Sequence, residues 1–145
     1  MRPFAATPLV SSCLLVMALW TTGCAQTKTN VYVEVPQNVN GGAPMHMMVR
    51  AIPDAIQQET YEEAASLMFI KPQDDSVVLT QPVFPGERFS LALPDVEKND
   101  VVLYFFFTHP DPKDRFRVPL QKPLPAEVFI TLGEQAVDRV QMRRR

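Results

Sequence analysis

Apolar and polar residues alternate with a period of two along much of the chain. Between residues 31 and 35, valines alternate with a tyrosine and a glutamate, and Pro36 follows. This alternation predicts a strand with one buried face, and the proline predicts its end. The same reasoning predicts strands at 45–52, 77–80, 89–93, 116–120 and 128–132, with a last short segment around Val137.

One apolar run differs from the others because it does not alternate. Residues 101–108 read Val-Val-Leu-Tyr-Phe-Phe-Phe-Thr. A strand of this kind has both faces covered. We therefore predict that it is central, with an opposing sheet on one side and a helix or loop on the other.

A single helix is predicted between Pro53 and Phe69. Thr60 and Glu63 have the spacing of a capping box, in which each side chain binds the backbone amide of the other residue. The alanines and the leucine that follow favour a helix. The residues expected to share its apolar face are Tyr61, Ala64, Ala65 and Met68.

The number and positions of the prolines indicate the fold class. The chain has 145 residues, among them 14 prolines. Proline disfavours helix interiors and central strands, and here it stands mostly between the predicted strands, as in the expected turns at 82–87 and 109–114. We predict one all-β domain over 31–140, a two-sheet β-sandwich of seven to eight short strands with one short helical insertion. Residues 141–145 are predicted to form a solvated basic tail.

The first residues have the organisation of a secretory signal. Arg2 precedes a mostly apolar stretch at 9–20, and small residues come before Cys24. The stretch is too short for a good membrane span, which needs about 20 apolar residues. We therefore predict a cleaved signal peptide at 1–23.

Thr22-Gly23-Cys24 resembles the lipobox of bacterial lipoproteins, in which the cysteine is lipidated and becomes the first residue of the mature protein. The resemblance implies a covalent lipid on Cys24 and a lipidated tether at 24–30. Ala25 after the cysteine implies sorting to the outer membrane. The alternative is an ordinary signal peptide that contains a cysteine and is cleaved elsewhere.

Charge and motifs exclude several functions. The net charge is -2 and the pI is about 5.6, so no basic field favours nucleic acid. The chain has no glycine-rich phosphate loop, no Gly-x-Ser-x-Gly elbow and no His-Glu-x-x-His pattern. His46 and His109 are the two histidines, and prolines explain the segment with Asp111 and Asp114 better as a turn than as a metal site. We expect no catalytic residue, no metal, no small-molecule substrate and no cofactor beyond the lipid.

The loop at 36–44 is the candidate recognition site. It exceeds the usual hairpin length of about two to five residues, and long loops in compact domains are often functional. Prolines bracket it, and we expect it on the surface, with Val39 projecting as a hydrophobic anchor. The alternative is a long connection without a partner. The residues predicted to bind are Asn38, Val39, Asn40, Gly41, Gly42, Ala43 and Pro44.

The order of these features carries a family resemblance. The lipobox comes first, followed by the first strand, the Asn/Gly/Pro loop and a strand with Arg50. The helix at 60–67 and the segment Phe84-Pro85-Gly86-Glu87 come next, and then the long apolar strand and an arginine-rich strand. This order resembles the TssJ (SciN) lipoproteins of the bacterial type VI secretion system.

The resemblance implies a transthyretin-like β-sandwich in the outer membrane, facing the periplasm, whose first loop holds the periplasmic end of the inner-membrane TssM subunit. Cys24 matches the lipidated cysteine of that family, and Asn40, Gly41 and Pro44 match its polar loop. The expected function is a non-enzymatic adaptor that stabilises a trans-envelope complex. Two alternatives stay open: a free-standing lipoprotein that binds a peptide, sugar or metal, and a small envelope hydrolase.

Overall fold

The computed structural model describes residues 28–56, 59–71, 73–94, 96, 98–113 and 115–144. The predicted signal peptide at 1–23 and the predicted lipidation site at Cys24 lie outside the described residues. Within them, no helix has the length and apolar character needed to cross a membrane.

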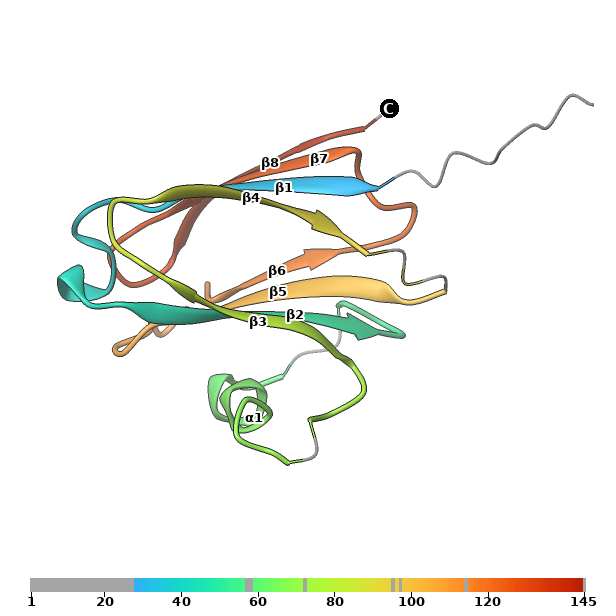
Figure 1. Ribbon diagram of the computed structural model, residues 1–145, viewed down its shortest axis with the longest axis horizontal. Helices are drawn as coiled ribbons and strands as arrows, with labels where there is room; N and C mark the ends of the chain where they lie inside the picture. The colour runs from blue at the N-terminus through green and yellow to red at the C-terminus, as the bar shows by residue number, and fades with distance from the viewer. Residues whose placement is uncertain are drawn as a thin grey trace, which may run out of the picture.

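Two four-stranded sheets face each other (Figure 1). β1 pairs with β7 in parallel, and the other neighbours are antiparallel. The first sheet has the order β4 (Arg88–Leu93), β1 (Thr29–Glu34), β7 (Glu127–Leu132), β8 (Val137–Arg143). The second has the order β3 (Val77–Val83), β2 (Met45–Ile52), β5 (Asp100–Phe106), β6 (Arg117–Leu120). The predicted β-sandwich is confirmed.

The core lies between the sheets and continues beneath a short helix, α1 (Tyr61–Ser66), on the outer face of the second sheet (Figure 1). β5 is an inner strand and is buried from Val101 onward, as its unbroken apolar run predicts. The predicted capping box is confirmed, with Thr60 and Glu63 bonded in both directions. The Tyr61 hydroxyl donates a hydrogen bond to the Phe107 carbonyl, which fixes the helix to the end of β5.

Two boundaries differ from the prediction. β1 begins at Thr29, inside the predicted tether, because the buried Thr29 hydroxyl donates to the Pro125 carbonyl at 2.7 Å. β3 continues to Val83 through Pro82, where a turn was predicted. Proline is tolerated there because β3 is an edge strand, whose outer side needs no amide donor.

The basic C-terminal segment is a third difference. β8 extends through Arg143, so 141–143 belong to the sandwich and not to a solvated tail. Arg143 pairs with Glu127 at 3.5 Å, and its guanidinium lies 5.0 Å from the centre of the Phe129 ring. The prediction failed because arginines on the exposed face of an edge strand give the same sequence pattern as arginines in a solvated terminal tail.

Candidate functional site

The β1–β2 loop lies at the end of the sandwich opposite the start of β1 (Figure 1). It contains a short 3-10 turn, η1 (Val39–Gly42), with Asn40, Gly41 and Gly42 at positive φ. Two consecutive glycines suit this backbone because they lack the Cβ that makes positive φ costly. The loop therefore has a defined shape.

Asn40 holds this loop to the rest of the molecule. Its backbone N–H donates to the Glu134 carbonyl at 2.8 Å, and its Oδ1 accepts from the Thr108 N–H at 2.7 Å. Its Nδ2 donates to the carbonyls of Ala43 and Pro44 at 3.3 and 3.2 Å. The residue is 9% exposed, so its predicted place among exposed partner-binding residues is wrong. Its role is to position the loop.

Val39 is also buried. Its exposed fraction is 0%, and it belongs to the hydrophobic core cluster. The prediction that it projects as an anchor is wrong. An apolar side chain beside the open end of the sandwich gains more by filling that end than by facing water. Whether the other predicted residues bind a partner remains a prediction.

The exposed part of the loop is smaller than predicted. Five of the seven predicted positions are exposed: Asn38, Gly41, Gly42, Ala43 and Pro44. The β3–β4 turn lies beside them, because the Gly86 N–H donates to the Val35 carbonyl at 3.0 Å and the Gln37 side chain lies where a Cβ of Gly86 would stand. Phe84 in that turn is a large apolar residue and is 49% exposed. The sequence feature that could have indicated an exposed apolar residue here is a phenylalanine directly before a Pro-Gly turn.

Replacing Asn40 with alanine should lower the free energy of unfolding by about 2 to 3 kcal/mol. The part-buried hydrogen bond from the Thr108 N–H would be lost, which costs about 0.5–1.5 kcal/mol. Alanine would also have to hold φ 51° without the local side-chain hydrogen bonds to the Ala43 and Pro44 carbonyls that make this backbone tolerable for asparagine. Denaturant unfolding measures the loss. Asn40→Gly should lose less, because glycine adopts positive φ freely. Equal stability of Asn40→Ala and the wild type would contradict this role.

A buried ionic cluster lies at the α1 side of the second sheet. Arg50 in β2 is 7% exposed, and its Nη1 lies 2.6 and 2.7 Å from the two carboxylate oxygens of Glu59. The Tyr104 hydroxyl donates to the same carboxylate, and Arg50 Nε donates to the Ser76 hydroxyl at 2.9 Å. These contacts fasten the segments on both sides of α1 to the sheet.

The titration of this cluster follows from its contacts. Burial raises the pKa of the Glu59 carboxyl, but hydrogen bonds from Tyr104 and Arg50 and the charge of Arg50 outweigh it, so the pKa lies below its ordinary value. Burial, and then the bond to Glu59, raises the pKa of Tyr104 well above its usual range. Glu59 is therefore ionised and Tyr104 neutral at neutral pH, which suits a structural cluster.

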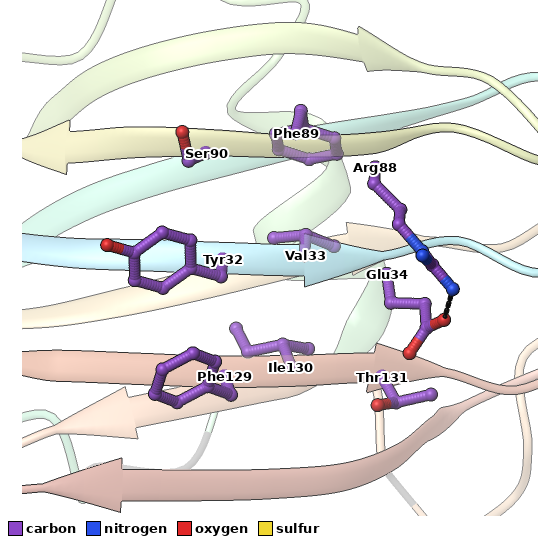
Figure 2. A pocket seen from close by; sticks show the side chains of 9 residues that line it. All are labelled: Tyr32, Val33, Glu34, Arg88, Phe89, Ser90, Phe129, Ile130 and Thr131. Atoms are coloured by element: carbon purple, nitrogen blue, oxygen red, sulfur yellow. Dashed lines mark hydrogen bonds and ion pairs between the residues drawn. The ribbon is translucent and has the colours of Figure 1, made fainter.

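A shallow depression of about 380 Å³ lies on the outer face of the first sheet (Figure 2). The Tyr32 and Phe129 rings stack there with centroids 4.9 Å apart, and Arg88 pairs with Glu34 at 2.5 Å. Tyr32 is 37% exposed. Glu34 and Arg88, the two charged residues that line the depression, pair with each other.

The other candidate polar residues are dispersed. His46 in β2 and His109 after β5 are both exposed. Asp111 pairs with Arg115 at 2.5 Å, and that hydrogen bond is the main reason why its pKa is lowered. Asp114 lies outside the described residues. In the part of the chain that the structure describes, no three potential metal ligands converge.

The protein is a small β-sandwich with a loop at one end, and hydrogen bonds to the rest of the domain hold that loop in a defined conformation. The chain belongs to the family of the IglE N-terminal domain, whose sequence model matches residues 46–132. No curated protein sequence matches it.

Solved structures show the same fold. The T6SS lipoprotein TssJ1 from Pseudomonas aeruginosa is 15% identical, with a TM-score of 0.59 over 82% of this chain and 98% of that one. Serratia marcescens Lip, a membrane-bound component of the type VI secretion system, is 12% identical, with a TM-score of 0.55 over 79% and 98%. A chain in the structure of the T6SS protein TssM C-terminal domain (869-1107) from EAEC is 14% identical, with a TM-score of 0.61 over 77% and 95%. The fold implied by the resemblance to TssJ lipoproteins is confirmed, and none of these matches is named as an enzyme.

Proposed function

We propose that this chain is a non-enzymatic outer-membrane lipoprotein that faces the periplasm and holds the periplasmic end of a TssM-like inner-membrane protein in a type VI secretion system. The observation that carries the proposal is the position of the β1–β2 loop. It follows the end of β1 that points away from the predicted lipid anchor, on a fold shared with T6SS lipoproteins. A loop in that position faces away from the membrane.

The distance from the anchor supports the proposed geometry. Cys24 precedes Thr29 by five residues, which reach at most about 17 Å when extended. A sandwich on so short a tether stays in a thin layer beside the membrane, where its effective concentration toward a partner is high. More than one acyl chain is needed for lasting attachment, since each buried methylene contributes about 0.8 kcal/mol.

The ligand-binding alternative has less support. Such a site needs convergent polar groups that are free to meet a ligand. In the depression of Figure 2, Glu34 and Arg88 bind each other instead. The exposed loop positions, together with Phe84, offer a mixed polar and apolar surface of the kind that proteins bind.

Replacing Cys24 with serine should move the protein from the outer-membrane fraction to the soluble periplasmic fraction. The serine hydroxyl cannot take the thioether-linked lipid, so only the folded domain would remain. Cell fractionation and immunoblotting measure this, and the TssM-like subunit should co-purify with wild-type protein from solubilised membranes. Undiminished membrane attachment of the serine variant would contradict the anchor, and absence of the subunit from the purified protein would contradict the adaptor.

A further inference from the structure

β8 is an edge strand that lacks the proline found in both edge strands of the second sheet. The edge strands β3 and β6 of the second sheet each contain a proline, Pro82 and Pro119. Proline on an edge discourages the addition of another strand. β8 has no proline. The backbone N–H of its first residue, Val137, is already used, because it donates to the Arg115 carbonyl at 2.7 Å. The free edge therefore lies beyond Val137.

The backbone polar groups on that edge can be assigned. The Arg143 carbonyl accepts from the Ala126 N–H at 2.9 Å, so the polar groups of Arg143 face β7. Polar groups alternate between the two sides of a strand, so those of Val140 and Met142 point away from β7. They form the template that an added strand would use.

Side chains distinguish β8 from β4, the other edge of the first sheet. Val140 and Met142 are 37% and 47% exposed, whereas the large apolar side chains of β4, Phe89, Leu91 and Leu93, are more covered. Arg139 and Arg144 have no acidic partner among the described residues, and Arg143 meets Glu127 only at 3.5 Å. An added strand would cover apolar surface and meet positive charge.

We propose that β8 receives an extended, acidic segment of a partner protein, which pairs with its free edge and extends the first sheet. The inference rests on the proposed function, since it takes the segment to come from the TssM-like subunit. A second copy of this chain fits less well. Antiparallel pairing of two β8 strands about Gln141 would place Arg139 opposite Arg143, and like charges opposite each other destabilise a sheet.

Hydrogen exchange on the full lipoprotein in detergent, alone and with the periplasmic region of the TssM-like subunit, tests this. The amides of Val140 and Met142 should exchange at least about 10-fold more slowly in the complex. Val140→Pro removes one outward amide without touching the β7 ladder and should weaken binding at least about 10-fold, whereas Val140→Ile should bind like the wild type. Arg139→Glu should also weaken binding.

The possible outcomes distinguish failure of the β8 edge-pairing from failure of the proposed adaptor function. A complex that forms without slower exchange in β8, or that Val140→Pro leaves intact, overturns the edge-pairing and spares the adaptor function. Concentration-dependent protection of β8 in the lipoprotein alone would show that a second copy covers the edge, which also overturns the proposal. Absence of any complex overturns the adaptor function itself. Val140→Glu, which places a negative charge at the edge where the acidic segment would pair, should weaken binding even if the proline variant misfolds.

Discussion

A variant with Asn38→Arg and Ala43→Arg is expected to lose affinity for the TssM-like subunit by about 100-fold while it stays fully folded. Both positions are exposed in the β1–β2 loop, and the Asn38 side chain makes no capping hydrogen bond. Their φ values are -92° and -93°, so arginine enters without backbone strain. The two long cations would hold a partner away from the loop. Calorimetric titration with the periplasmic region of the subunit measures the loss.

The matched control is Gln73→Arg with Gln121→Arg. Both glutamines are exposed and lie outside the loop, so the control adds the same charge elsewhere on the surface. It should bind like the wild type, and both variants should unfold at the wild-type midpoint. Equal affinity of the loop variant and the control would show that the exposed loop does not bind.

Arg50→Ala should lower the free energy of unfolding by about 3 kcal/mol. Removing one partner of a buried ion pair costs about 3–5 kcal/mol, because the other charge stays buried without compensation. The Arg50 and Glu59 side chains are 9% and 24% exposed, and the partial exposure of Glu59 places the effect at the lower end. Denaturant unfolding gives the value.

A second substitution checks the cause. Arg50→Met with Glu59→Gln removes both charges and leaves an amide oxygen to accept from Tyr104, so it should recover most of the stability. If the double variant is as unstable as Arg50→Ala, packing around Arg50 and not the charge of Glu59 sets the loss.

The same pair sets a pH dependence. The folded-state pKa of Glu59 is lowered from 4.5, so the unfolded chain binds its proton more tightly than the folded chain. The stabilisation is therefore complete above about pH 4.5 and is lost as the pH falls through the lowered pKa. Unfolding measured across this range should show a larger loss in the wild type than in the double variant, since Asp111, whose pKa is also lowered, is present in both.

The strands could be predicted because burial of one face gives alternating apolar residues, and burial of both faces gives an unbroken apolar run. Alternating valines gave β1, and the unbroken run at 101–108 gave the inner strand β5. The limits of β3 and β8 could not be predicted in the same way. An edge strand tolerates Pro82 on its open side and arginines on its exposed face, so its composition matches that of a turn or tail.

The candidate site was predicted in position but not in detail. The length and the Asn-Gly pair located the loop, because those features follow from local backbone chemistry. Val39 and Asn40 were assigned to its surface, yet both are buried by elements distant in sequence, the latter through Thr108 and Glu134. Such contacts leave no local pattern. Phe84 went unrecognised for the same reason, since only the folded sandwich brings its turn beside the loop.

The most direct test of the adaptor function is photo-crosslinking in living cells from a photoreactive amino acid placed at Ala43. Ala43 is exposed and extended in the β1–β2 loop, so the probe should point toward whatever the loop contacts. The adaptor function predicts a crosslink to the TssM-like subunit from position 43 and none from Gln73. A crosslink to that subunit from position 73 and not from position 43, or from neither, would contradict it.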